Sequence, residues 1–227
     1  MRNSWISILL LFFATQLLLG QSKDEKKLNI AFYFQKQKLE KGKYYRSIQG
    51  DTLSFDKVKC YFSEITWLQD DGDTIAQQKY PQLVDWEAPP SLAIPDALIK
   101  NGSGFLQFTV GVPYAYNVNG VFEGDLDPVK GMYWAWQSGF IFVKIEGKSP
   151  NCTTYKNQFL FHLGGFSAET NALTRVNLPV TFNSSQLSID LFYLFDNIKV
   201  RKTNAVMSPS AEAVQLANYF KTGIAIQ

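Results

Sequence analysis

The sequence is poor in the residues that most enzyme active sites require. Among its 227 residues it has one histidine, His162, and two cysteines. A Ser–His–Asp or Cys–His centre would depend entirely on His162, and no Gly-x-Ser-x-Gly motif is present. The chain also lacks the His and Cys ligands of a typical zinc site, a glycine-rich phosphate loop and a Cys-x-x-Cys-His haem motif. We therefore predict that the protein is not an enzyme.

A strong excess of charge is also missing. The 22 basic and 20 acidic residues give a formal net charge of +2 at pH 7. Such a balance offers no electrostatic attraction for nucleic acid or for an acidic partner. We predict that the protein does not bind nucleic acid.

The most prominent apolar run lies at the N-terminus, at residues 5–19. Arg2 precedes it, and Gly20-Gln21-Ser22 follow it. A positive charge, a short apolar centre and a small residue at its end are typical of a secretory signal peptide, and the run is too short to favour a stable membrane span. We predict a signal peptide over residues 1–20, a single domain over residues 21–227, and a periplasmic or secreted protein.

The two cysteines, Cys60 and Cys152, would lie in an oxidising compartment after export. They could form a disulfide there, but two buried free thiols would give the same sequence pattern. Both possibilities stay open.

The rest of the chain is dominated by short apolar segments with β-periodicity. They are separated by Gly, Pro and Asn turns, without alternating helices, which is typical of an antiparallel sandwich or barrel. We predict an all-β, antiparallel, Greek-key-like β-sandwich. The expected strands are residues 28–34, 51–68 (one or two strands, with a break near Asp56), 104–112, 140–146, 158–164, 173–182 and 187–195.

Two segments depart from this pattern. Residues 80–97 contain four prolines, which favours a long loop or a broken short helix. The C-terminal segment has helical spacing of apolar residues, with Ser208 as the expected cap, Pro209 at the first helical position and Gly223 at the end. We predict one short helix there, packed on the sheet.

The most unusual stretch is residues 124–147. It begins with a turn that carries Asp125 and Asp127, and it then places Tyr133, Trp134 and Trp136 within four residues before a β-strand. The aromatic rings could simply fill one end of a β core, because large aromatic residues usually do. The carboxylate pair could resemble a hydrolase site, although neighbouring carboxylates are common in turns.

Four sequence blocks resemble the MbnP family of exported copper-binding proteins. They are DTLSFDKVKCYFSEI, DLDPVKGMYWAWQSGFIFVKIEG, FLFHLG and VMSPSAEAVQLANYF, and MYWAWQSG is the most distinctive part. The resemblance implies a periplasmic or cell-surface β-sandwich. It also implies that a tryptophan is oxidised to kynurenine by a di-haem partner enzyme of the MbnH/MauG type, and that the kynurenine helps to bind copper.

The resemblance also implies a set of site residues in this chain. Trp134 or Trp136 would be the modified tryptophan, His162 the imidazole ligand and Met207 a sulfur ligand. An imidazole and a thioether suit Cu(I). Related copper sites use more than one histidine, whereas this chain has only one.

Three alternatives to a copper protein follow from the same residues. The first is a structural or interaction module that has lost the metal. The second is a carbohydrate-binding sandwich that uses Tyr133, Trp134 and Trp136 as a stacking platform. The third is hydrolysis by Asp125 and Asp127.

Overall fold

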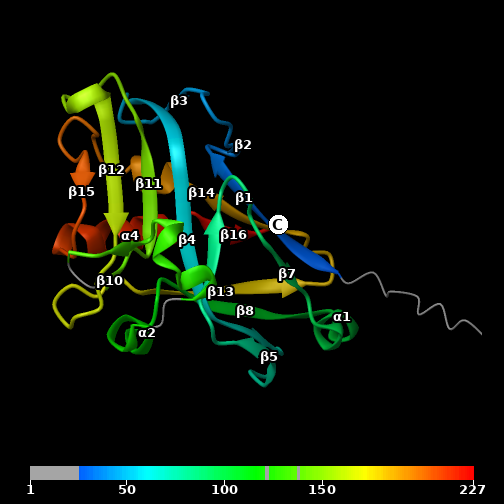
Figure 1. Cartoon of the computed structure of the whole chain (residues 1–227). Helices are drawn as coiled ribbons and strands as arrows, with labels where there is room; N and C mark the ends of the chain where they lie inside the picture. The colour runs from blue at the N-terminus through cyan, green and yellow to red at the C-terminus, as the bar shows by residue number, and fades with distance from the viewer. Residues whose placement is uncertain (1–25, 121–122, 137–138) are drawn as a thin grey trace, which may run out of the picture.

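β-strands are the main secondary structure in a computed structural model, which describes residues 26–120, 123–136 and 139–227. The predicted signal peptide lies outside the described residues. The strands form a nine-stranded sheet, a five-stranded sheet and a two-stranded hairpin. Figure 1 shows these parts in one view. The prediction of a mostly β fold is confirmed.

The nine-stranded sheet is organised around β4, a single strand over Thr52–Leu68. The strand continues through Asp56, but its pairing with β11 is irregular at that residue, because Glu146 is opposite Lys57 whereas Gly147 is opposite Phe55. A second irregularity lies further along. The register shifts between Ser63 and Thr66, and Glu64 has a positive φ of 54°. An extra residue of this kind bends a strand. In Figure 1 β11 and β12 stand upright beside β4, whereas β8 and β13 run across below them, so the sheet is curled.

The other strands of this sheet lie on both sides of β4. Cys60 shows this, because it is opposite Val143 of β11 and also opposite Val84 of β6. β8 lies on the same side of β4 as β11, since Phe62 is paired with both β6 and β8. The remaining strands are β3 (Tyr45–Arg46), β5 (Thr74–Gln78), β6 (Gln82–Asp85), β8 (Ser103–Val110), β11 (Val143–Lys148), β12 (Gln158–Leu163), β13 (Thr174–Thr181) and β15 (Ala205–Val206).

The five-stranded sheet has β1 at its centre. β1 pairs with β14 in a parallel arrangement, and β12 pairs with β15 in the same way. The prediction of a wholly antiparallel fold is therefore wrong at these two pairs. The strands of the five-stranded sheet are β1 (Lys27–Phe34), β2 (Gln37–Lys38), β7 (Ser91–Ala93), β14 (Gln186–Asp190) and β16 (Ile224–Ile226).

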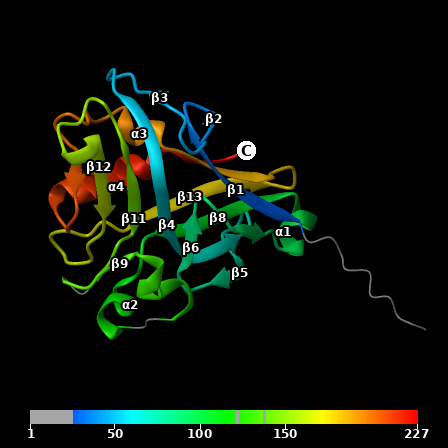
Figure 2. The same cartoon turned by 45° about the horizontal axis from the view of Figure 1, so that its top comes forward.

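One hydrophobic core joins the two sheets. The ring of Phe34 on β1 lies 5.8 Å from the ring of Phe55 on β4, and Phe55 in turn lies 5.9 Å from Phe159 on β12. All three side chains are fully buried. Figure 2 shows β1 alongside the curled sheet. Burial of such large rings is the main source of stability available to a fold of this kind.

The C-terminal helix is confirmed, with a different start. α4 covers Ala211–Thr222, and the hydroxyl of Ser210 accepts a hydrogen bond from the N–H of Ala213 at 3.1 Å, so Ser210 is the cap in place of Ser208. Gly223 ends the helix as predicted. No helix in the described ranges is long and apolar enough to cross a membrane.

Two further expectations are corrected. The proline-containing segment 80–97 holds the strands β6 and β7, because each finds a partner far away in sequence, β4 and β1 respectively. The segment 187–195 ends as the short helix α3 (Phe192–Phe195). The other helices are α1 (Asp96–Asn101) and α2 (Tyr114–Asn119), with 3-10 turns η1 (Gly124–Leu126), η2 (Pro128–Lys130) and η3 (Tyr155–Asn157).

Candidate functional site

The tryptophan pair lies on a small hairpin formed by β9 (Tyr133–Trp134) and β10 (Gly139–Phe140). A hydrogen bond of 2.9 Å from the N–H of Ile141 to the carbonyl of Met132 extends its ladder. Asn117 of α2 holds the hairpin in place. Its amide oxygen accepts from the N–H of Phe140 at 3.0 Å, and its amide nitrogen donates to the carbonyl of Val112 at 2.8 Å.

The two aspartates before the hairpin hold the loop together. The carboxylate of Asp125 accepts from the N–H of Leu83 on β6 at 2.9 Å, and its carbonyl accepts from the hydroxyl of Tyr61 at 2.8 Å. The carboxylate of Asp127 accepts from the N–H of Val129 at 2.9 Å and caps η2. Both carboxylates thus satisfy backbone donors, which is the usual role of Asp at turns and helix starts.

The two tryptophans have very different environments. Trp134 is 5 % exposed, whereas Trp136 at the hairpin end is 69 % exposed. Their ring centroids are 6.2 Å apart, with planes tilted by 55°. Tyr133 packs edge-on against Phe140 at 5.1 Å. A flat sugar-stacking platform needs exposed, roughly coplanar rings, and these rings do not form one.

The indole N–H of Trp134 is buried without a hydrogen-bond partner among the described residues. Unpaired buried donors are costly and uncommon in folded proteins. A cavity of about 170 Å³ adjoins this ring. Its lining includes Phe140, Phe166, Ser167 and Pro209. The ring therefore borders a small space that can admit another group.

His162 lies on β12 and is 8 % exposed. Its Nε2 is 2.8 Å from the carboxylate of Glu146 on the neighbouring strand β11. The ammonium groups of Lys57 and Lys144 lie 3.3 Å from the same carboxylate. The hydrogen bond from His162 and the two lysine charges lower the pKa of Glu146 to about 2, against an opposing effect of burial.

Lys144 connects this charged cluster to the loop before the hairpin. Its ammonium donates to the carbonyl of Gly131 at 2.9 Å, and burial lowers its pKa. The cluster of Lys57, Lys144, Glu146 and His162 was not predicted from the sequence. The alternation of Lys144 and Glu146 along the strand indicated only a face turned toward solvent.

The tryptophan hairpin and the histidine strand meet at the end of β12. A Cβ atom added to Gly164 would lie 2.8 and 2.9 Å from two atoms of the Trp134 ring, so the indole packs directly on that glycine. Gly164 is two residues after His162, which corresponds to about 7 Å along an extended chain. The Trp134 ring thus contacts the end of the strand that carries His162, and the proximity of a tryptophan to the imidazole itself stays a prediction.

Met207 also lies near this strand end. β15 pairs in parallel with β12, with Val206 opposite Phe161 as the last paired position, and Met207 is the first residue after β15. The Met207 side chain is 43 % exposed. No group of three or more His, Cys, Asp or Glu residues with metal-binding geometry occurs in the described ranges.

Cys60 and Cys152 are free, buried thiols. The structure therefore does not contain the disulfide that the sequence left possible. Asn151, the neighbour of Cys152, accepts a hydrogen bond from the N–H of Thr52 at 3.1 Å. Thr52 is eight residues before Cys60 on β4, or about 26 Å along the strand. A disulfide needs Cα atoms within about 7 Å. Burial raises the pKa of both thiols, to about 11 for Cys152.

Together these features define a class of protein. It is a mostly β protein in which a hairpin carrying two tryptophans packs against the end of a strand with a buried histidine–carboxylate pair, and a methionine directly follows the paired strand β15.

Comparison with known proteins gives the family. The family model described as MbnP matches residues 23–208, and the chain belongs to this family. Among solved structures, the chain is similar to MbnP from Methylosinus trichosporium, with a TM-score of 0.57 and 18 % sequence identity. The alignment covers 83 % of this chain and 86 % of that one. No curated protein sequence matches the chain.

Proposed function

We propose that this MbnP-family protein is exported and binds copper, as Cu(I), beside the tryptophan hairpin. The observation that carries the proposal is the packing of the Trp134 ring on Gly164, two residues from His162. It supports a site in which the Trp134 ring, the imidazole of His162 and the thioether of Met207, the residue after β15, would meet at one end of β12. Family membership agrees with this function.

The donor atoms suit a soft, low-coordinate metal. Glu146 is hydrogen-bonded to Nε2 of His162, and a carboxylate on one ring nitrogen typically orients a histidine whose other nitrogen binds a metal. Nδ1 would therefore be the ligand atom. Met207 would add sulfur, and imidazole with thioether favours Cu(I) over harder cations. Copper bound there would be stored or transferred, and we propose no catalytic turnover by this chain.

We further propose that Trp134 is the tryptophan that becomes kynurenine. Its ring is the one next to the histidine strand, and it borders the cavity of about 170 Å³. Kynurenine carries an aryl amine and a ketone, which offer a metal donor atoms that an indole does not. A di-haem partner oxidase of the MbnH/MauG type would supply the oxidation. Trp136 is exposed and 6.2 Å away, so it provides a surface contact for that partner.

The proposal also covers the architecture of the protein and its location. We propose that the two sheets form a Greek-key-like sandwich, which the shared aromatic core between β1 and β4 supports. The rigid sandwich would hold the hairpin and β12 in fixed relation. We also propose that the mature protein starts after residue 20 and functions in the periplasm or outside the cell.

Copper titration of the mature protein tests the proposal. Protein purified from its native host should bind one tight equivalent of Cu(I), and His162→Ala should lose it. Met207→Leu keeps the volume and removes the sulfur, so it should weaken binding by about tenfold or more. Met132→Leu, at a buried methionine of the loop, is the matched control and should bind normally.

Intact mass and peptide mapping of the same native protein test the modification. Conversion to kynurenine replaces one carbon by one oxygen in net composition, and the change should map to Trp134. Unmodified native protein that binds no copper would support the metal-free interaction module instead.

A further inference from the structure

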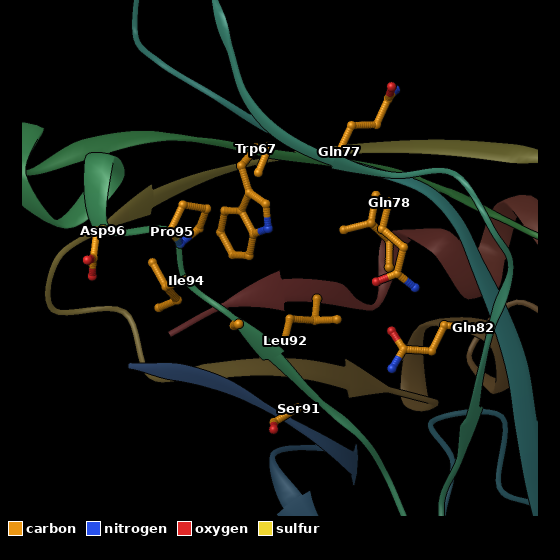
Figure 3. Close-up of a pocket in the computed structure, with 12 residues that line it drawn as sticks. Trp67, Gln77, Gln78, Gln82, Ser91, Leu92, Ile94, Pro95 and Asp96 are labelled. Carbon is orange, nitrogen blue, oxygen red and sulfur yellow. The ribbon is translucent and has the colours of Figure 1, made fainter. Parts of the chain in front are cut away.

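A second cavity lies apart from the histidine and tryptophan site. It measures about 800 Å³ and opens between the nine-stranded sheet and the strand β7 of the other sheet. This volume is in the range of known ligand sites. Figure 3 shows its lining. The lining residues are Ile65, Trp67, Ala76, Gln77, Gln78, Gln82, Ser91, Leu92, Ala93, Ile94, Pro95 and Asp96.

The strand β7 borders the cavity with main-chain groups that are not used by its own sheet. Its ladder partner is β1, and the N–H of Ile94 donates to the carbonyl of Lys26 at 2.8 Å. In an antiparallel ladder, hydrogen-bonded and non-hydrogen-bonded pairs alternate. The N–H and carbonyl groups of Ser91 and Ala93 therefore point away from β1. Both residues line the cavity.

The strand β5 borders the cavity in the same way. The N–H of Glu64 on β4 donates to the carbonyl of Lys79 at 3.5 Å, so these two residues form a hydrogen-bonded pair. Because hydrogen-bonded and non-hydrogen-bonded pairs alternate, the N–H and carbonyl groups of Ala76 and Gln78 point away from β4. Within the described part of the chain, β5 pairs with β4 alone. The cavity is therefore flanked by two sheet edges, which is the situation in which added strands bind.

The side chains in the cavity are mostly uncharged. Figure 3 shows Trp67, Gln78 and Gln82 reaching into it, and Asp96 is the one charged residue of the lining. The amide oxygen of Gln82 is buried and accepts no hydrogen bond from the described residues. A buried acceptor of this kind needs a donor, which water or a bound group can supply. Trp67 and its apolar neighbours provide a surface for an apolar side chain.

We propose that this groove binds an extended, uncharged peptide segment of a partner protein, which adds as a strand to the free edge of β7. Its main chain pairs with Ser91 and Ala93. Because side chains alternate along a strand, one side chain is apolar and packs on Trp67, and another donates an amide or hydroxyl hydrogen to Gln82. A polypeptide is favoured over a sugar because only a polypeptide repeats donors and acceptors at the spacing of a sheet edge.

A displayed library of uncharged peptides about seven residues long, longer than the three-residue strand β7, is the probe. It is screened against the whole native protein, and enriched peptides are measured by fluorescence anisotropy. N-methylation of the peptide backbone should weaken binding at alternate positions only, by about tenfold, because only every second N–H faces the edge. Absence of any enriched peptide, or equal tolerance of N-methylation at all positions, overturns the proposal.

Variants of the protein locate the site. Ala93→Pro removes an outward N–H without removing a hydrogen bond to β1, so it should leave the thermal midpoint unchanged and weaken peptide binding about tenfold. Ala76→Pro is the matched substitution on β5 and should bind normally. Gln82→Met should weaken binding about fivefold, and only for peptides with a side-chain donor.

Two results of these measurements would refute the assignment. Loss of binding in Ala76→Pro but not in Ala93→Pro would place the peptide on β5. Dimers in sedimentation that disappear in Ala93→Pro would show that a second copy of the chain occupies the edge.

Discussion

The charge of Glu146 should stabilise the fold in a way that depends on pH. The depression of its pKa from 4.5 to about 2 corresponds to about 3 kcal/mol of unfolding free energy. The side chain is 22 % exposed, and solvent screening reduces such values, so we expect about 1–2 kcal/mol. Glu146→Gln keeps an acceptor for His162 and removes the charge, and it should lower stability by this amount at pH 7.

The sign of the pH dependence follows from linkage. The folded pKa lies below the unfolded one, so the stabilisation is fully present above about pH 5 and is lost as the pH falls toward about 2. Urea unfolding of wild type and Glu146→Gln at several pH values measures it. The difference between them should shrink by about half or more at pH 3.

An exposed ion pair supplies the control. Glu87 pairs with Lys41 at 2.6 Å on the surface, and Glu87→Gln should leave the unfolding midpoint nearly unchanged. Equal losses for Glu146→Gln at pH 7 and pH 3 would refute the reasoning, because an effect independent of ionisation would then be responsible.

Three further predictions concern Gly164, Asp127 and the two cysteines. Gly164→Ala should destabilise the fold by about 2 kcal/mol, since its Cβ would collide with the carbonyl oxygen of Phe140 at 2.6 Å and with the Trp134 ring at 2.8 Å. A thermal midpoint equal to wild type would contradict this close packing. Asp127→Ala removes the η2 cap and should cost about 1 kcal/mol in chemical unfolding, whereas Asp127→Asn should retain most of it. Cys60 and Cys152 should resist alkylation in the native protein and should both react once it is unfolded, and a reductant should not change the thermal midpoint of unfolding. A native protein whose mass shows one disulfide would refute this.

The site illustrates how local turn chemistry and distant contacts combine. The caps of Asp125 and Asp127 set the loop, and Asn117 ties the hairpin to α2. Gly164 then lets the Trp134 ring approach β12 more closely than any side chain at that position would allow. These contacts bring together groups that are about 30 residues apart in sequence.

The sequence by itself determined the features that depend on local patterns. Alternating apolar residues indicated the longer strands, Gly223 marked the end of the C-terminal helix, and the MYWAWQSG block indicated the family. Local periodicity carries this information because side chains alternate along a strand wherever its partner lies.

Only the tertiary structure decided which segments are partners. The parallel pairing of β1 with β14 and the strands within the proline-containing segment 80–97 depend on contacts far apart in sequence. The same is true of Glu146 beside His162, and of the separation of Cys60 from Cys152 by about half the length of β4. A sequence pattern records which face of a strand is apolar, but the neighbour of that strand is chosen by packing of the whole core.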